Sequence, residues 1–336
     1  MIETARASKA MPKSTGKWGL LFFLRAALAL ILLLFLLSMI DLRATGQALS
    51  QLKPRFALVA LALMLVNYCL KTYRWASILR IERPDISLGR LLRYNFASMF
   101  LGNLIPSSLA PDVMRVVYMS RRSVDPKTVI SSIIADRILG NLSLAFLTLA
   151  SVLLLKDTGF LPLGSLMFYG ALGFLLFAIM IPLLLRNPAW ANGLSRLLRP
   201  LAKSMKLTSI SEIYQQLRSY GLHLRALSKS LAISFINVLI AVLEFYLIAH
   251  SLSTQISIGY FLLFIPLISF LSALPISIAG LGLLEASLVY FFSQVGMSLE
   301  TCIASALIFR ILQLICLLPG MAIYVTDGFF VKQLPA

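Results

Sequence analysis

Long apolar runs that match the thickness of a lipid bilayer recur along the chain, separated by polar connections. A helix that crosses the hydrocarbon core needs about 20 predominantly apolar residues. We therefore predict an all-α polytopic integral membrane protein with about six full spans. The predicted spans are residues 18–40, 56–73, 129–155, 161–185, 231–250 and 301–325.

Two further apolar stretches are interrupted. Residues 91–105 and 260–274 each run into a proline, followed by a short break that contains serine, glycine or proline and by a second short helix. Proline removes a backbone donor and glycine loosens a helix, so both segments are predicted to form re-entrant hairpins or broken helices. The expected hinge residues are Pro106, Pro275, Gly280 and Gly282.

Positive charge is distributed unevenly between the connections. Five Lys or Arg residues lie in the chain up to Arg25, ten in residues 71–127 and eight in 186–229, whereas the other connections carry three, one and none. The positive-inside rule then places the three basic regions in the cytoplasm. We expect a cytoplasmic basic tail (1–17), a transmembrane domain (18–326) whose first span is not cleaved, and a cytoplasmic C-terminal tail (327–336). The apolar residues within loop 186–229 favour an amphipathic interfacial helix there.

The two interrupted segments carry the same pattern of charged residues. Asp112 precedes Arg137 by 25 residues, and Glu285 precedes Arg310 by the same 25. In each copy the acid lies on the short helix after the break, and the arginine lies inside the next long span. The charge distribution makes the first hairpin enter from the cytoplasm and the second from outside. We therefore predict an inverted-topology repeat over about 56–155 and 231–325.

The two arginines within long spans need partners. An arginine near the middle of a membrane costs about 2.5–3.5 kcal/mol on insertion scales, so it has to face a protein interior or a watery cavity. Asp112 and Glu285 are the expected partners of Arg137 and Arg310. Two compatible interpretations are open: structural ion pairs that hold the hairpins to the helices, or binding of a lipid phosphate during its passage.

Residues around the first break extend this set. Arg115 follows Asp112 at i+3, so both project from the same face of the short helix. Ser107 and Ser108 lie in the break, where the unpaired amides of a half-helix suit an anion. We expect these three residues to bind substrate together with the two acid–arginine pairs.

Two other charged features have competing explanations. Glu244 is a lone acid deep in its span, where it either couples a proton or partners an arginine. Arg74 and the arginines that follow it crowd the cytoplasmic end of the second span. We favour a role of this cluster in setting the membrane topology over a role in capturing a lipid headgroup.

Composition narrows the class of function. Of the 336 residues 59% are hydrophobic and 13% charged, against about 45–50% and about 25% in a soluble domain. The basic residues that give the net charge of +17 lie between apolar spans. Interaction with anionic lipid headgroups explains them better than binding to nucleic acid does. HExxH, Walker and GxSxG motifs are missing from the sequence, so we expect no catalysis, no cofactor and no bound metal.

A set of motifs spread over nearly the whole chain points to a known family. They are Arg74-Trp75, Pro106-Ser107-Ser108 through Asp112 and Arg115, Ala135-Asp136-Arg137, Pro275 with Gly280-Leu281-Gly282-Leu283-Leu284-Glu285, and Phe309-Arg310. In these motifs the chain resembles the transmembrane, flippase-like region of the lysylphosphatidylglycerol synthases. The family usually has Gly-Gly-Asp in the first break, where this chain has Ala110-Pro111-Asp112.

The resemblance implies a multi-pass inner-membrane protein that moves a lipid between leaflets. The expected partners are membrane lipids: anionic or aminoacylated phospholipids, or polyprenyl-linked lipids. Full-length synthases also carry a soluble aminoacyl-tRNA-dependent transferase domain, and we expect this chain to be a stand-alone member without it. The alternatives are a non-catalytic scaffold or accessory subunit of an envelope-lipid biosynthetic enzyme and, third, a membrane-embedded transferase.

Overall fold

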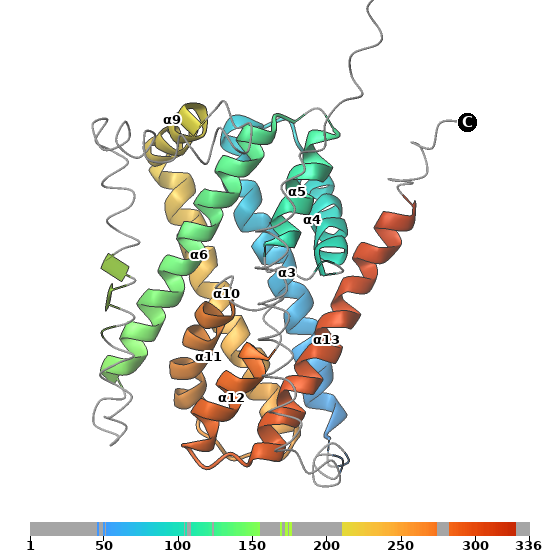
Figure 1. Ribbon diagram of the computed structural model, residues 1–336, viewed down its shortest axis with the longest axis vertical. Helices are drawn as coiled ribbons and strands as arrows, with labels where there is room; N and C mark the ends of the chain where they lie inside the picture. Colours follow the sequence, from blue (N-terminus) through green and yellow to red (C-terminus); the bar gives the residue numbers. More distant parts are fainter. Residues whose placement is uncertain are drawn as a thin grey trace, which may run out of the picture.

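The computed structural model describes residues 52–103, 109–122, 124–154, 210–273 and 282–326, with isolated positions at 46, 50, 105, 169, 172, 173, 175 and 176. Within these ranges the regular structure is helical (Figure 1). In chain order the helices are α3 (Pro54–Glu82), α4 (Leu88–Asn103), α5 (Ala110–Ser120), α6 (Pro126–Leu154), α9 (Ile210–Leu222), α10 (Leu224–Ser251), α11 (Ile258–Ala273), α12 (Leu283–Ser293) and α13 (Leu299–Thr326).

Four of these helices are long and apolar enough to cross a membrane. They are α3, α10 and α13 over their full lengths and α6 over Pro126–Ser151, and they correspond to four of the six predicted spans. The predicted span 18–40 lies outside the described residues, as does most of 161–185. The all-helical, polytopic membrane architecture is confirmed.

The two interrupted segments form helical hairpins at opposite ends of the bundle. Helix α4 packs against α5 at the end that carries α9, and α11 packs against α12 at the other end (Figure 1). Helices α4 and α11 end at Asn103 and Ala273, shortly before the prolines of the two breaks, as expected for residues that precede proline. The hairpins therefore lie at opposite ends of the bundle, and their entry from opposite faces of the membrane, with the α4–α5 end in the cytoplasm, stays a prediction.

The helices on either side of the bundle repeat in order and spacing. Helices α3 and α4 begin at residues 54 and 88, and α10 and α11 begin 170 residues later, at 224 and 258. After the breaks the offset is 173, since α5 and α6 begin at 110 and 126, and α12 and α13 at 283 and 299. The two four-helix units are thus related by a three-residue difference in the length of the break.

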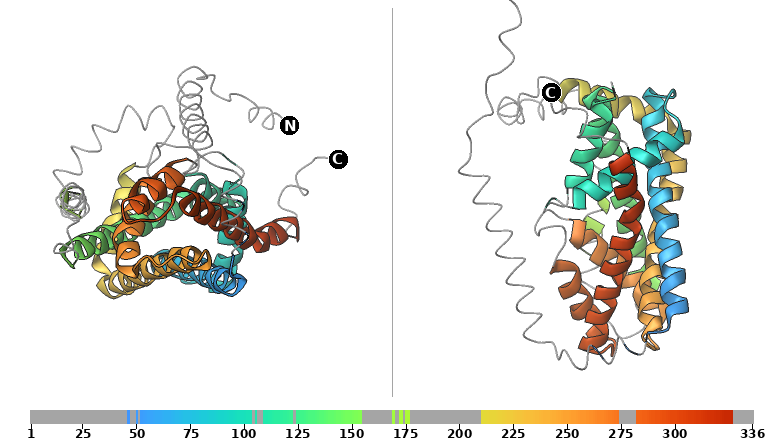
Figure 2. Two further views of the ribbon diagram at one scale, coloured as in Figure 1. Left: turned by 90° about the horizontal axis from the view of Figure 1, so that it is seen from below. Right: turned by 90° about the vertical axis from the view of Figure 1, so that its right-hand side faces the viewer.

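Contacts between the two units follow the same relation. Helix α4 packs against α13, and its counterpart α11 packs against α6, while α3 and α10 pack against each other. Figure 2 shows this side-by-side pairing of α3 and α10 along the bundle. Each hairpin is therefore held by the last long helix of the other unit, as an inverted repeat requires.

The first hairpin closes through a small residue. A Cβ atom on Gly102 of α4 would lie 2.4 Å from the backbone of Pro111 at the start of α5. Ala110 and Pro111 form the first turn of α5, where proline is well tolerated. Glycine at 102 thus lets the two arms approach although the break lacks the Gly-Gly of the resembled family.

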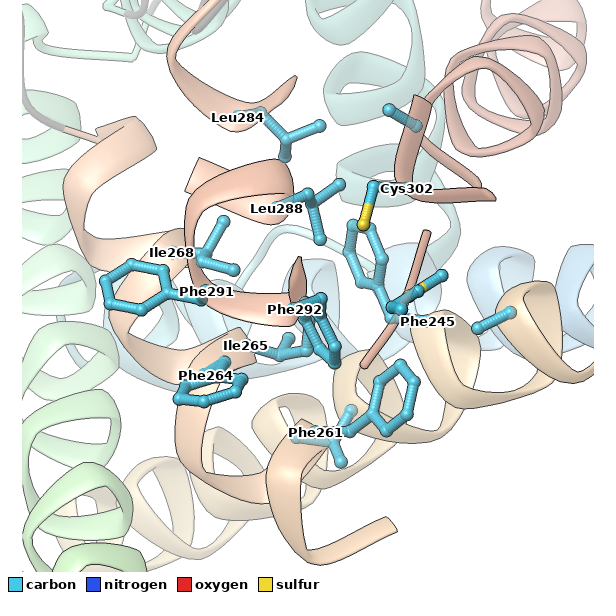
Figure 3. Close-up of a cluster of buried hydrophobic side chains, with 14 of the residues drawn as sticks. Phe245, Phe261, Phe264, Ile265, Ile268, Leu284, Leu288, Phe291, Phe292 and Cys302 are labelled. Carbon is cyan, nitrogen blue, oxygen red and sulfur yellow. The ribbon is translucent and has the colours of Figure 1, made fainter. Parts of the chain in front are cut away.

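Aromatic packing supports the second hairpin. Phe264 of α11 contacts Phe291 and Phe292 of α12, with ring centroids 5.3 Å and 5.2 Å apart. Phe245 of α10 and Cys302 of α13 join the same cluster (Figure 3). A pocket at its edge is lined by apolar side chains, apart from the hydroxyl of Ser305. The residues that line this pocket carry no charged side chain.

Helix α9 lies within the sequence of the predicted basic loop 186–229. It runs across the end of the bundle (Figure 1). It is joined to the start of α6 by an ion pair between Glu212 and Lys127 and by a 3.1 Å hydrogen bond from Gln216 to Thr128. Tyr220 is buried where α9 packs on the bundle, in a cluster with Ile78 of α3 and Ala135 of α6. The amphipathic helix predicted within 186–229 is thus present over 210–222, and residues 186–209 lie outside the described part.

Candidate functional site

The acids of the two hairpins occupy equivalent positions. Asp112 is the third residue of α5, and Glu285 is the third residue of α12. The first turn of a helix has unpaired amides and a positive dipole end, so a carboxylate is stabilised there. Each hairpin therefore presents one negative charge where its second helix begins.

The arginine of each unit reaches the acid of the same unit. Arg137 and Arg310 are both the twelfth residue of their long helix. Arg137 forms an ion pair with Asp112, and the Nε atom of Arg310 lies 3.0 Å from Oε1 of Glu285. Both predicted pairings are confirmed.

The first pair is enlarged by a second arginine. The Nη1 atom of Arg115 lies 3.2 Å from Oδ1 of Asp112, so one carboxylate receives two guanidinium groups. Arg115 is held by Asn95, whose Oδ1 accepts from its Nε at 2.5 Å, and by Trp75, whose ring centroid is 5.1 Å from its Cζ. The side chains of Asp112, Arg115 and Arg137 carry a formal net charge of +1.

The second pair is balanced. Glu285 also accepts a 2.8 Å hydrogen bond from the backbone amide of Gly282, and Arg310 donates to Gln313 at 3.3 Å. Gly282 has a φ of 77°, a conformation that glycine adopts readily. Its predicted role at a bend is consistent with this backbone, because the bend brings its amide to Glu285.

Solvent access differs between the arginines. The side chain of Arg137 is 37% exposed and that of Arg310 is 22% exposed, whereas their carboxylate partners are 16% and 17% exposed. Arginines inside apolar helices that keep this much exposure suit contact with a ligand as well as with an acid.

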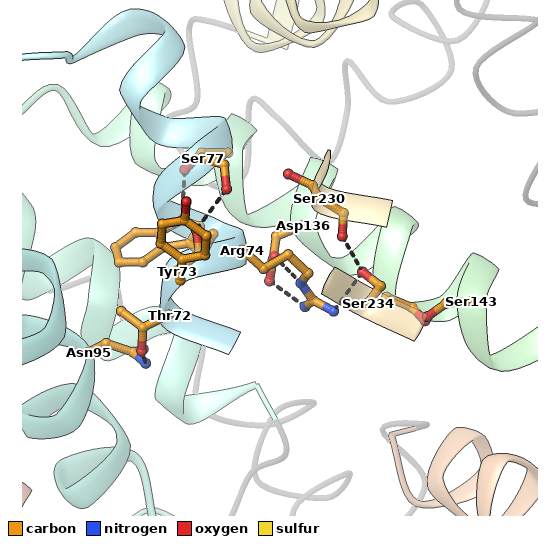
Figure 4. Close-up of polar contacts among 12 residues, drawn as sticks. Thr72, Tyr73, Arg74, Ser77, Asn95, Asp136, Ser143, Ser230 and Ser234 are labelled. Carbon is orange, nitrogen blue, oxygen red and sulfur yellow. Dashed lines mark hydrogen bonds and ion pairs between the residues drawn. The ribbon is translucent and has the colours of Figure 1, made fainter. Parts of the chain in front are cut away.

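A further ion pair was missed by the sequence analysis. Arg74 of α3 forms a two-pronged contact with Asp136 of α6, with Nε–Oδ1 and Nη2–Oδ2 distances of 2.6 Å and 2.8 Å. Its Nη1 also donates to Ser234 of α10 at 3.1 Å (Figure 4). The hydropathy pattern ended the span at Tyr73, but α3 continues to Glu82. Arg74 is therefore a buried junction of three helices, not only part of a topology-determining cluster.

Glu244 contacts an asparagine, whereas one of the two expectations for it was an arginine partner. Its Oε1 accepts a 2.9 Å hydrogen bond from Nδ2 of Asn67, and its side chain is buried. Asn67 is the only hydrogen-bond partner that Glu244 has in the described part of the chain. The alternative expectation, that Glu244 exchanges a proton, is untouched by this contact.

The hinge residues Pro106, Pro275 and Gly280 and the candidate anion ligands Ser107 and Ser108 lie outside the described residues. Among the described residues, His, Cys, Asp and Glu side chains form no group of three or more that would hold a metal ion.

Comparison with known proteins identifies a family and a relative. The model of the lysylphosphatidylglycerol synthase transmembrane region matches residues 22–320. The chain is also 24% identical, over 284 residues, to a UPF0104 membrane protein of Methanothermobacter thermautotrophicus, with 79% of this chain and 83% of that protein covered. Since the family model spans both four-helix units and both acid–arginine pairs, the chain belongs to the family of the lysylphosphatidylglycerol synthase transmembrane region.

Proposed function

We propose that the protein is a lipid transporter of the inner membrane that moves a phospholipid or lipid-linked anionic headgroup between leaflets, without catalysing a reaction. The observation that carries this proposal is the pair of acid–arginine contacts at equivalent positions of two hairpins that lie at opposite ends of the bundle. Membrane transporters built from inverted repeats use broken helices of this kind to hold substrate and to open toward each side in turn.

The charge of the first cluster favours an anionic ligand. Arg115 and Arg137 share Asp112, so a phosphate at this point would add a second negative charge where two guanidinium groups meet. Guanidinium groups bind phosphate oxygens with strong, two-pronged hydrogen bonds. In the proposed mechanism the phosphate exchanges with Asp112 on Arg137, and with Glu285 on Arg310 once the opposite side opens.

The membrane orientation is proposed on charge alone. The α4–α5 hairpin and α9 would face the cytoplasm with both termini, because the basic connections gather at that end. Headgroups would then enter the first cluster from the cytoplasmic leaflet.

Replacing Arg137 and Arg310 by glutamine tests the proposal. We expect purified wild-type protein in liposomes to move at least one of fluorescent phosphatidylglycerol, its lysyl derivative and a polyprenyl phosphate. Each substitution is expected to slow that movement about tenfold or more, since a hydrogen bond to a charged group contributes about 1.5–3 kcal/mol. Loss of fluorescence to an external quencher measures the rate.

Arg83→Gln is the matched control. Arg83 also forms a two-pronged contact with an acid, Asp85, at 2.8 Å, but both lie in the exposed α3–α4 connection. This variant is expected to move lipid at the wild-type rate. If Arg137→Gln and Arg310→Gln also do so, the arginines are structural and the proposed mechanism is wrong.

A scaffold or accessory subunit is the second candidate, because each arginine already has a carboxylate partner that satisfies it. The double variant Asp112→Asn/Arg137→Gln removes the charges of one pair together. Under the scaffold proposal, a strain carrying this variant keeps its wild-type envelope-lipid composition provided that the protein stays in the membrane. Under the transport proposal, the variant is in the membrane and lipid movement is lost.

A further inference from the structure

A line of polar residues runs along the contact between α3 and α10. Asn67, Lys71 and Arg74 recur on one face of α3 at spacings of four and three residues. On α10, Ser234 and Glu244 contact α3, and the buried Asn237 lies between them along the helix. We call these six residues the α3–α10 seam. Because α3 belongs to the first four-helix unit and α10 to the second, the seam lies between the two repeats.

Two contacts fix the register of the seam. Asn67 donates to Glu244 at 2.9 Å, and Arg74 donates to Ser234 at 3.1 Å. Along each antiparallel helix, Lys71 lies between Asn67 and Arg74, and Asn237 lies between Ser234 and Glu244. The two contacts are seven residues apart on α3, or about 10 Å at the rise of an α-helix. Lys71 and Asn237 therefore occupy the interval between them.

Buried amide atoms in this interval lack partners. Asn67 and Asn237 are 2% and 3% exposed. Neither Oδ1 of Asn67 nor either polar atom of Asn237 has a hydrogen-bond partner among the described residues. Leaving such an atom unsatisfied costs about 1–3 kcal/mol, and buried water is the common remedy. These amides are suited to hold water inside the seam.

The charges of the seam face each other across it. Glu244 is 3% exposed, and the Lys71 ammonium, which lies 5.6 Å from the ring centroid of Tyr68, interacts electrostatically with it. Lys71 also lies within electrostatic range of Arg74 and Asp136. The seam thus holds a buried acid within electrostatic range of a cation, together with buried amides that can solvate both.

Few other titratable groups face Glu244. Tyr68 of α3 and Cys316 of α13 interact with it electrostatically, while α11 packs phenylalanines, including Phe261, against α10. Arg310 lies within electrostatic range of Tyr68. Tyr68 thus lies within electrostatic range of both Glu244 and Arg310, the arginine that we propose binds lipid in the second unit.

We propose that the α3–α10 seam is a proton path and that Glu244 carries one proton per transported lipid. This inference rests on the proposed lipid transport. Glu244 takes a proton from water on one side to become a neutral carboxylic acid, and it releases that proton to water on the other side. The Lys71 ammonium is the counter-charge of the ionised carboxylate. Because the seam is the interface between the repeats, protonation removes an attraction across it and favours their relative movement.

The test uses proteoliposomes with an imposed pH difference, an internal pH dye and a membrane potential clamped by potassium and valinomycin. Fluorescent phosphatidylglycerol and its lysyl derivative are the probes. A difference of one pH unit is expected to make the transported probe about tenfold more concentrated in one leaflet than in the other. The reason is that one pH unit is worth about 1.4 kcal/mol for one coupled proton. Reversing the gradient is expected to reverse the ratio.

Glu244→Gln is expected to abolish both the unequal distribution of the probe between leaflets and the proton flux, while the probe still equilibrates between the leaflets. Gln keeps an acceptor for Asn67, and Glu244→Asp, which keeps a carboxylate, is expected to retain both readouts. Glu300→Gln, at an acid in the first turn of α13, is the matched control and is expected to behave as wild type.

Three possible results distinguish failure of this inference from failure of the proposed function. Lipid movement without proton flux in the wild type overturns the proton path and leaves lipid transport standing. Proton flux that Glu244→Gln removes, without lipid movement, supports the path and overturns lipid transport. Absence of both in folded wild-type protein overturns both.

Discussion

Substitution of Asp136 by alanine is expected to lower the free energy of unfolding by about 3–5 kcal/mol, because it leaves a buried guanidinium without its counter-charge. The side chains of Arg74 and Asp136 are only 12% and 7% exposed. Without Asp136, Arg74 would keep a single neutral acceptor, Ser234. Reversible unfolding in mixed detergent micelles, followed by circular dichroism, measures the effect.

Two further variants test the cause of that loss. Asp85→Ala removes an exposed acid that also contacts an arginine, and we expect a change below about 1 kcal/mol. Removing both charges in Arg74→Met/Asp136→Leu is expected to restore most of the stability, because an apolar pair replaces an ion pair at little cost. Equal losses for Asp136→Ala and Asp85→Ala would show that the three-helix junction is not held by this pair.

Replacement of Gly320 by alanine is expected to cost about 1–3 kcal/mol, the usual range for overpacking. A Cβ atom at this position of α13 would lie 2.2 Å from the carbonyl oxygen of Phe96 and 3.0 Å from Cβ of Phe100, both in α4. A backbone oxygen cannot turn aside as a flexible side chain can, so α4 and α13 would have to separate. Because this contact joins the hairpin of one repeat to the last helix of the other, we also expect slower lipid movement.

Gly89→Ala is the control for helix propensity. Gly89 lies in the first turn of α4, and a Cβ atom there meets nothing within 4 Å. Alanine is favoured over glycine in a helix by about 0.5–1 kcal/mol, so this variant is expected to be as stable as wild type or slightly more so. Gly320→Ala protein that unfolds at the same denaturant concentration as Gly89→Ala protein would contradict the close α4–α13 contact.

The sequence by itself determined the architecture of the described part. Apolar runs of bilayer length predict spanning helices because a membrane leaves the backbone few other choices. The breaks after 103 and 273, which combine proline with serine, glycine or a second proline, predicted the hairpins. Proline alone does not end a helix here, since Pro266 and Pro319 lie inside α11 and α13. The pairs of Asp112 with Arg137 and of Glu285 with Arg310 were also predictable, since short connections join the helices that carry them.

Only the tertiary structure decided which distant helices share their polar residues. Arg74 and Asp136 are 62 positions apart, and Asn67 and Glu244 are 177 apart. A sequence shows which face of a helix is polar, but the rotation and register of two helices are set by close packing over their whole length. The junction at Arg74 and the α3–α10 seam therefore emerge only when α3, α6 and α10 lie side by side.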